Sequence, residues 1–205
     1  MTTSIADIMA IAPVIPVLII DDIATALPIA EALVAGGLPV LEVTLRTPAS
    51  LEALSIMSRV TGAVVGAGTV LNPAMLDQAI GAGAQFIVSP GLTEPLAKAA
   101  HAASIPLLPG VATAGDIMRG LDLGLDRFKF FPAMANGGIP ALKALSGPFG
   151  KVRFCPTGGI TADTAADWLV LSSVGCVGGS WLVKPGDMPD AIEQAARAAS
   201  MLRLR

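Results

Sequence analysis

The segment VLEVTLRTPASLEALSIMSRVTGAVVGAGTV, residues 40–70, contains the unit from which the whole chain is built. It opens with an apolar run at Val40–Arg46 and closes with a second apolar run at Val64–Val70. Residues 48–59, between the two runs, have the Ala-, Leu- and Met-rich pattern of a helix. A strand, a helix and a second strand in this order predict a parallel pair of strands with a right-handed crossover.

The same unit recurs along the 205 residues of the chain, and no linker or low-complexity tail interrupts it. The apolar runs predicted as strands are Pro13–Ile20, Val40–Arg46, Val64–Val70, Phe86–Pro90, Pro106–Val111, Arg127–Pro132, Arg153–Ile160 and Cys176–Val183. Helices are predicted at 22–35, 48–59, 73–82, 93–103, 114–123, 138–146, 161–171 and 187–203, after a leader helix at about 3–11. These repeated units predict an α/β fold, a (β/α)8 TIM barrel near the short end of its size range. We expect one domain, residues 1–205; an open doubly wound sheet is the alternative.

The composition limits the classes of function open to the chain. Hydrophobic residues make up 53% and charged residues 14%, so the chain is not disordered, and we expect another subunit to cover part of its apolar surface. A net charge of −3 provides no basic patch for a nucleic acid. The uncharged stretches Val60–Leu76 and Trp168–Val183 are interrupted by glycines and polar residues, so no membrane-spanning helix is predicted.

Two features favour a cytoplasmic location. The first residues, MTTSIAD, lack the positively charged region of a secretory signal. Cys155 and Cys176 both fall in apolar, strand-like segments, and we interpret them as buried free thiols in a reducing compartment. A disulfide between them is the alternative.

Strand parity places charged side chains of Val40–Arg46 inside the barrel. Side chains alternate along a strand, so Glu42, Thr44 and Arg46 are predicted to point inward when their neighbours face the helices. Charged groups are costly to bury unless they are paired or used in a reaction. Glu42 and Arg46 are therefore either a structural ion pair or part of an active site.

Lys129 differs from the other lysines of the chain. Lys98 and Lys143 fall in predicted helices, and Lys151 and Lys184 in turns, whereas Lys129 lies in the aromatic run RFKFFP. Side chains alternate along this strand, and Lys129 lies at a position whose side chain is predicted to point into the barrel. Burial there would lower the pKa of the amine and make it a nucleophile. The alternative is a lysine that only neutralises Glu42.

Small residues gather where three predicted strands end: Gly66–Thr69, Thr157–Ile160 and Gly178–Ser180. The loops after strands seven and eight of a barrel often bind phosphate through backbone N–H groups that glycine leaves accessible. Glycine pairs are also common in ordinary turns, which is the alternative interpretation. Gly66–Thr69 is not followed by a P-loop lysine, so no nucleotide site is predicted.

No metal site is predicted. His101 is the only histidine and falls in a predicted helix, where we interpret it as structural or exposed. A metal site built from several histidines is therefore not possible in this chain.

Six motifs follow one another along the chain: Glu42–Thr47 (EVTLRT), Gly66–Asn72 (GAGTVLN), Ser89–Gly91 (SPG), Leu108–Gly110 (LPG), Lys129–Ala133 (KFFPA) and Phe154–Ile160 (FCPTGGI). In this order they resemble the motifs of the 2-dehydro-3-deoxy-6-phosphogluconate (KDPG) aldolase and 4-hydroxy-2-oxoglutarate (KHG) aldolase family. The GGSW run at Gly178–Trp181 extends the resemblance to essentially the whole chain. Thr44 and Arg46 favour the gluconate enzyme over its galactonate relative.

The resemblance implies a class I aldolase, usually a homotrimer, that needs no cofactor and acts on a phosphorylated 2-keto acid. It implies that Lys129 forms the Schiff base, that Glu42 is the general acid and base, and that Arg46 and Thr69 contact the substrate. Other pocket positions of the family match Pro90, Phe131, Thr157, Gly158, Gly159 and Ser180.

The chain departs from the family pattern in two loops, at Ala114–Asp116 and at Met134, where the family often has Glu. These departures affect the expected aldehyde selectivity, not the expected mechanism. Three other functions remain open: the same cleavage of 4-hydroxy-2-oxoglutarate, another phosphate-binding barrel lyase or isomerase, and a non-catalytic trimeric scaffold.

Overall fold

The computed structural model describes residues 4–202, and within them eight strands form one parallel sheet in the order β7-β6-β5-β4-β3-β2-β1-β8. Bridges from Phe154 to Val174 and from Thr157 to Gly178 join its two ends, so the sheet closes into a barrel. The (β/α)8 prediction is confirmed and the open sheet is excluded. The strands are β1 (Val14–Leu18), β2 (Val40–Thr44), β3 (Val64–Gly68), β4 (Phe86–Ser89), β5 (Leu107–Val111), β6 (Arg127–Phe130), β7 (Arg153–Pro156) and β8 (Val177–Gly179).

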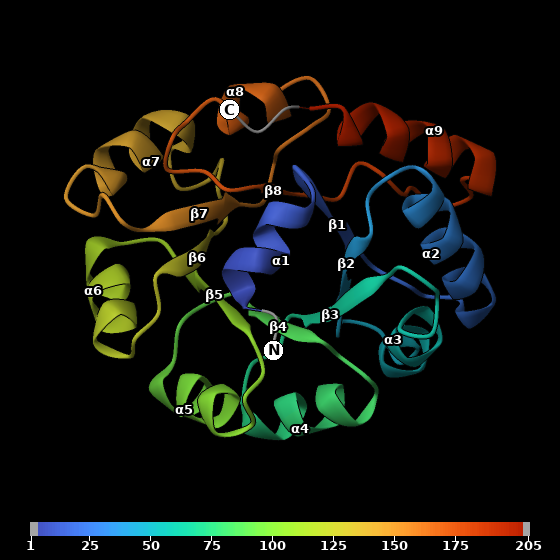
Figure 1. Cartoon of the computed structure of the whole chain (residues 1–205), viewed down its shortest axis with the longest axis horizontal. Helices are drawn as coiled ribbons and strands as arrows, with labels where there is room; N and C mark the ends of the chain where they lie inside the picture. Colours follow the sequence, from blue (N-terminus) through green and yellow to red (C-terminus); the bar gives the residue numbers. More distant parts are fainter. Residues whose placement is uncertain (1–3, 203–205) are drawn as a thin grey trace.

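The helices surround the strands, and α1 lies across the middle of the view in Figure 1. No helix within residues 4–202 is long and apolar enough to cross a membrane. Residue 3 of the predicted leader helix and residue 203 of the predicted last helix lie outside the described residues. The helices are α1 (Ile5–Ile11), the 3-10 helix η1 (Ile23–Thr25), α2 (Ala26–Ala35), α3 (Ser50–Met57), α4 (Pro73–Gly81), α5 (Glu94–Ala102), α6 (Ala114–Asp122), α7 (Gly138–Ser146), α8 (Ala165–Leu169) and α9 (Pro189–Ser200).

Two predicted helices differ from the observed ones because local hydrogen bonds replace their first turn. The predicted helix 22–35 begins as η1, because the Asp22 carboxylate accepts a hydrogen bond from the Ala24 N–H at 2.9 Å. The predicted helix 161–171 shortens to α8, because the Thr164 hydroxyl accepts from the Thr161 N–H at 3.0 Å and closes a turn. Hydroxyl and carboxylate side chains compete in this way with helical backbone bonds.

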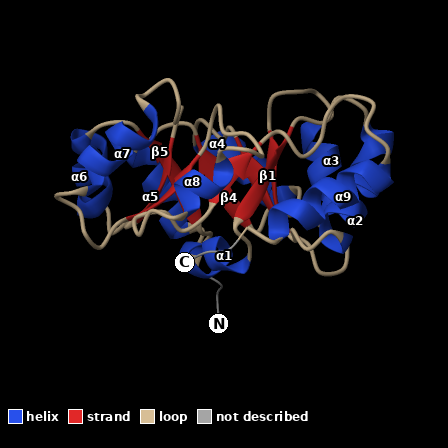
Figure 2. Cartoon of the chain, turned by 90° about the horizontal axis from the view of Figure 1, so that it is seen from above, coloured by secondary structure: helices blue, strands red, loops and turns tan. Residues whose placement is uncertain are grey.

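The lower half of the barrel interior is apolar, and α1 covers it. Figure 2 shows α1 beyond one end of the strands. Ile8 and Met9 of α1 pack into the barrel against inward side chains of the strands, among them Val40 and Phe86. Gly66 lies beside the Phe86 ring, which occupies the space that a side chain at residue 66 would need.

Cys155 and Cys176 belong to the same apolar cluster, and both are buried free thiols, as predicted. A hydrogen bond with Cys155 and burial raise the pKa of the Cys176 thiol well above its ordinary value. A second, larger cluster fills the space between the strands and the surrounding helices, where Phe128, Phe130 and Trp168 are buried.

Candidate active site

Glu42 and Lys129 face each other inside the barrel. Glu42 lies in the middle of β2, and Lys129 is the third residue of β6. The Lys129 ammonium donates to both carboxylate oxygens of Glu42, at 2.9 Å and 3.2 Å. The two residues are only 3% and 5% exposed, so each charge offsets the cost of burying the other. The inward orientation that strand parity predicts for both is confirmed.

Gly68 leaves room for the Glu42 carboxylate. Thr44 of β2 pairs with Gly68 of β3, and the Glu42 side chain lies against Gly68. A Cβ atom at this position would overlap with the carboxylate oxygen and with two carbons of the Glu42 side chain. This role of Gly68 was not predicted, although a glycine at an inward position of the neighbouring strand is a signal that could have indicated it.

Arg46 lies at the mouth of the barrel and not inside it, which corrects the prediction. β2 ends at Thr44, because the Arg46 N–H turns back to the Thr44 carbonyl at 2.8 Å. The exposed Arg46 side chain donates from Nε to the Thr69 hydroxyl at 3.0 Å. The structural Glu42–Arg46 ion pair is not formed. Among residues 4–202 no partner for the two Nη groups of Arg46 is found, so they are free to bind an anion.

Thr69, which follows β3, has a φ of +60°, in the left-handed region that non-glycine residues seldom occupy. Its hydroxyl contacts Arg46, which comes from the end of the neighbouring strand. Strained residues of this kind concentrate at functional sites, because the surrounding structure must hold them in place.

Phe131 and Pro90 also lie at the mouth. Phe131 follows β6, and the Lys129 Nζ atom lies 5.3 Å from the centroid of its ring. Pro90 follows β4, and its carbonyl passes so close to Gly110 of β5 that a Cβ atom there would overlap with it. Glycine at residue 110 therefore allows the loop after β4 to lie against β5.

The ends of β7 and β8 meet beside Thr157. Thr157 is buried and bridges to Gly178, where a Cβ atom would overlap with the threonine side chain. Gly158 and Gly159 have φ angles of 104° and 77°, which favour glycine. Within the described part of the chain neither glycine N–H donates a hydrogen bond, and exposed Ser180 follows β8. This group can present N–H and O–H donors to an anion.

The two departures from the family pattern have different surroundings. The Met134 N–H donates to the Gly158 carbonyl at 3.1 Å, so its exposed side chain lies beside the glycine pair. Asp116 instead caps α6 by accepting from the N–H groups of Ala112 and Thr113, at 3.1 Å and 3.0 Å. Partial burial raises the pKa of Asp116, but these hydrogen bonds outweigh it and hold the pKa below the ordinary value.

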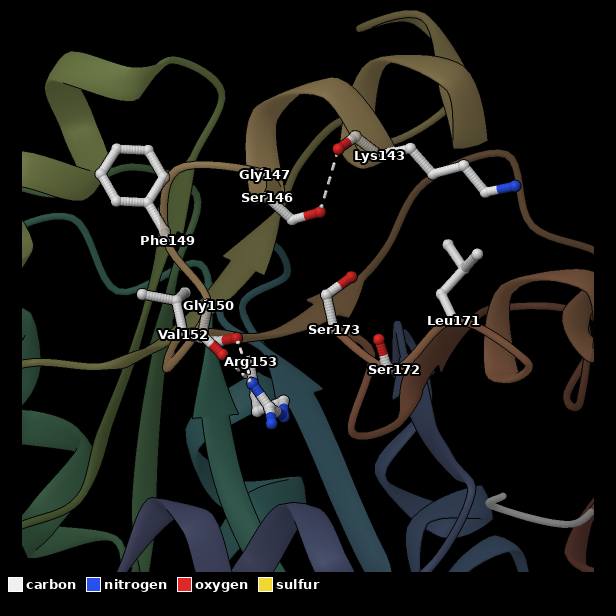
Figure 3. Close-up of a pocket in the computed structure, with 10 residues that line it drawn as sticks. All are labelled: Lys143, Ser146, Gly147, Phe149, Gly150, Val152, Arg153, Leu171, Ser172 and Ser173. Carbon is white, nitrogen blue, oxygen red and sulfur yellow. Dashed lines mark hydrogen bonds between the residues drawn. The ribbon is translucent and has the colours of Figure 1, made fainter.

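Two surface hollows lie away from this mouth. One of about 350 Å³ lies between the end of α7 and the start of β7, at the opposite end of the barrel (Figure 3). Its Arg153 donates to the Gly150 and Val152 carbonyls, both at 2.9 Å, so local backbone groups already bind this cation. The other, of about 420 Å³, lies between α2 and α3. Neither is lined by a predicted site residue.

His101 is exposed on α5, which agrees with its interpretation as structural or exposed. Among residues 4–202, no three His, Cys, Asp or Glu side chains lie close enough to hold a metal ion together.

Comparison with known proteins identifies the family. The family model for KDPG and KHG aldolase matches residues 5–195. The chain is 63% identical, over 194 residues, to the 2-dehydro-3-deoxy-phosphogluconate aldolase of Zymomonas mobilis, with 95% of this chain and 93% of the relative covered.

Solved structures agree with this result. The structure of the Zymomonas mobilis ZM4 aldolase with 3-phosphoglycerate has a TM-score of 0.96 and 60% identity, covering 99% of this chain and 98% of the other. A Legionella pneumophila KDPG aldolase with pyruvate captured as a covalent carbinolamine has a TM-score of 0.92 and 46% identity, covering 95% and 97%. The barrel, the buried pair of Glu42 and Lys129 and these matches lead to one conclusion: the chain belongs to the KDPG and KHG aldolase family.

Proposed function

We propose that the chain is a class I aldolase that cleaves 2-dehydro-3-deoxy-6-phosphogluconate into pyruvate and glyceraldehyde 3-phosphate. The observation that carries the proposal is the buried contact of the Lys129 amine with the Glu42 carboxylate. It places a nucleophile and a proton acceptor within 2.9 Å of each other inside the barrel. The covalent carbinolamine of pyruvate in the Legionella relative is the kind of adduct that such an amine forms.

The reaction begins when Lys129, in its neutral form, attacks the C2 ketone of the substrate. The hydroxyl group of this adduct takes up a proton from solvent and leaves as water, which gives an iminium ion that can accept electrons from the neighbouring C3–C4 bond. Glu42 takes the proton of the C4 hydroxyl as that bond breaks, and glyceraldehyde 3-phosphate leaves. The electron pair remains as an enamine, and Glu42 returns its proton to C3, which restores the carboxylate. Water then hydrolyses the imine, so pyruvate leaves and the Lys129 amine is restored.

Arg46 binds the carboxylate of the substrate in this proposal. Within residues 4–202 its Nη groups have no partner and its Nε donates to Thr69, which leaves the two Nη groups for an anion at the mouth. A charge-assisted, two-point contact between guanidinium and carboxylate is among the stronger hydrogen-bonded pairs. Phe131 and Pro90 line the pocket beside the imine.

The phosphate lies at the other side of the mouth in the proposal. The N–H groups of Gly158 and Gly159, which have no partner within residues 4–202, and the hydroxyl of Ser180 bind it, and Thr157 contacts the substrate beneath them. The phosphorylated ligand in the Zymomonas structure supports a phosphorylated substrate. The same chemistry on 4-hydroxy-2-oxoglutarate, which carries no phosphate, is proposed as a side activity because the family name includes it.

We propose that residues 1–205 act as one catalytic domain, that the enzyme is a cytoplasmic homotrimer, and that small molecules, not nucleic acids or membranes, are its partners. The free thiols support a reducing compartment. Exposed apolar side chains such as Ile19, Leu71 and Met188 support burial of surface between subunits. Light scattering should then give three times the 20.7 kDa chain mass, and a monomer would contradict the trimer.

Trapping of the imine tests the mechanism. Pyruvate with borohydride should inactivate the enzyme and add one reduced pyruvate per chain, which peptide mapping should place on Lys129. Lys129→Arg keeps the charge but cannot form an imine, so it should fold, resist labelling and lack activity, whereas the control Lys143→Arg on α7 should behave as the parent enzyme. Labelling of another lysine would refute the assignment. Failure to trap any adduct would favour the isomerase or the non-catalytic scaffold.

A further inference from the structure

The Arg46 side chain makes one hydrogen bond within residues 4–202, from its Nε to the Thr69 hydroxyl. Arg46 is exposed, and ordering a long side chain costs conformational entropy. Its position therefore depends on how the backbone of residues 45–50 is anchored between the end of β2 and the start of α3.

Two hydroxyl groups anchor this turn. The Thr47 hydroxyl donates to the Ile20 carbonyl at 2.5 Å, across to the loop after β1. Ser50 is 1% exposed; its oxygen accepts from the Thr47 N–H at 3.0 Å and lies 2.9 Å from the Thr47 hydroxyl oxygen. Because the single Thr47 hydroxyl proton is used on Ile20, the Ser50 proton is the one directed at Thr47, whose carbonyl lies 2.8 Å away.

These hydroxyls continue the contact of β1 with β2 beyond the point where the regular pairing stops. The last backbone register is Leu18 with Val43. The Thr44 hydroxyl then donates to the Leu18 carbonyl at 2.8 Å, and Thr47 repeats the arrangement one step later at Ile20. On the other side, the Leu45 N–H donates to the Gly68 carbonyl of β3 at 2.8 Å. The turn is thus tied to both neighbouring strands.

We propose that Thr47 and Ser50 are positioning residues that set the location of the Arg46 guanidinium. Thr47 holds the backbone from the β1 side, Ser50 locks Thr47, and Thr69 receives the Arg46 side chain on the β3 side. The inference rests on the proposed function, because it requires Arg46 to bind the substrate carboxylate. Neither hydroxyl contacts the reacting atoms; both act through Arg46.

A double-mutant cycle tests this inference. Thr47→Val removes the hydroxyl with little change of shape, and KM for the phosphorylated substrate should rise on the order of 10-fold, the loss expected for a hydrogen bond to a charged group. The carboxylate is bound equally before and during cleavage, so kcat should change little. Thr47→Ser keeps the hydroxyl and should restore KM. In an Arg46→Met background, Thr47→Val should have no further effect on KM, since the group through which it acts is gone.

Ser50→Ala provides a second, independent variant, and it should also raise KM without a matching loss of kcat. Ser58→Ala is its matched control, because Ser58 donates in the same way to a carbonyl three residues earlier, at 3.0 Å, but at the far end of α3. Ser58→Ala should leave KM unchanged.

The outcomes separate the inference from the proposed function. An unchanged KM in Thr47→Val and Ser50→Ala, or an equal rise in the parent and Arg46→Met backgrounds, would overturn the positioning role. If Arg46→Met itself left KM unchanged, the proposed carboxylate contact would be wrong, whatever the hydroxyl variants did.

Discussion

The two ends of the barrel interior are built from the same strands and have opposite chemistry. On β2, Val40 lies in the apolar cluster under α1, and Glu42, two residues later on the same face, holds a buried charge. The same step leads from Cys155 of β7, in the cluster, to Thr157 just after the strand, at the mouth. Side chains on one face of a strand recur every second residue. In both of these cases, a step of two residues therefore leads from the packed base of the barrel to its mouth.

The comparison shows what each end requires of its residues. The base needs volume and shape, since α1 seals it and every group in its cluster is apolar or a thiol. The mouth needs residues without side chains as much as it needs functional groups. Gly68, Gly110 and Gly178 lie where a side chain would overlap with Glu42, Pro90 or Thr157. We therefore expect that stability at the base and geometry at the mouth can be changed separately.

The largest effect is expected from Glu42→Gln, which keeps the size of the side chain but removes the proton acceptor. Imine formation with pyruvate should persist, whereas the cleavage rate should fall by about 10²–10⁴-fold, the usual contribution of general acid–base catalysis. Borohydride trapping and coupled detection of pyruvate measure the two steps. The control Glu52→Gln, on the exposed face of α3, should retain full activity. Unchanged turnover in folded Glu42→Gln would assign the proton transfer to another group.

Gly68→Ala should have the next largest effect. The new methyl group overlaps with the Glu42 carboxylate, so the carboxylate must move, and a displacement of about 1 Å can reduce a rate by roughly 10²-fold. The control is Gly81→Ala in α4, where no heavy atom lies within 4 Å of the new Cβ. Full activity in Gly68→Ala would mean that the position of the Glu42 carboxylate is not critical. It would also mean that the mouth tolerates an added methyl group, which the packed base would not.

Much of this arrangement was predictable from the sequence, because it depends on local patterns. Alternation along β2 and β6 was sufficient to point Glu42 and Lys129 inward, and the recurring strand and helix pattern was sufficient for the barrel. The Schiff-base and substrate-binding roles came from the resemblance to the family, and they remain proposals here.

The features that were not predicted depend on contacts across the fold. Arg46 was placed inside a strand, but a turn closed by its own N–H ends β2 two residues earlier. The roles of Gly68 and of the Thr47 hydroxyl depend on residues 26 and 27 positions away, Glu42 and Ile20. Strand alternation shows which side chains of one strand share a face, but it does not show which residue of another strand each of them meets.

Ser180→Asp should have a smaller effect, and one that depends on the substrate. An aspartate after β8 would lie near the proposed phosphate and repel it. We expect kcat/KM for the phosphorylated substrate to fall on the order of 10-fold, equivalent to about 1.4 kcal/mol, while activity on 4-hydroxy-2-oxoglutarate changes less. Equal losses on both substrates would place the phosphate elsewhere at the mouth.

The smallest effect on activity is expected at the base. Ile8 of α1 is 1% exposed, and Ile8→Ala should lower the free energy of unfolding by about 2–5 kcal/mol through lost burial and a residual cavity. Ile11→Ala, at a residue of the same helix that is 45% exposed, should change it by less than about 0.5 kcal/mol. Denaturant unfolding at one protein concentration measures both variants.

At a temperature where Ile8→Ala remains folded, its kcat/KM should stay within about twofold of the parent value, because additive effects are the rule for residues that share no partner. Ile8 packs among apolar side chains under α1, whereas Lys129 and Glu42 bind each other one step above. A loss of activity as large as that of Gly68→Ala, in a folded enzyme, would show that a change of packing at the base alters the position of Glu42. The two ends would then have to be treated as one site.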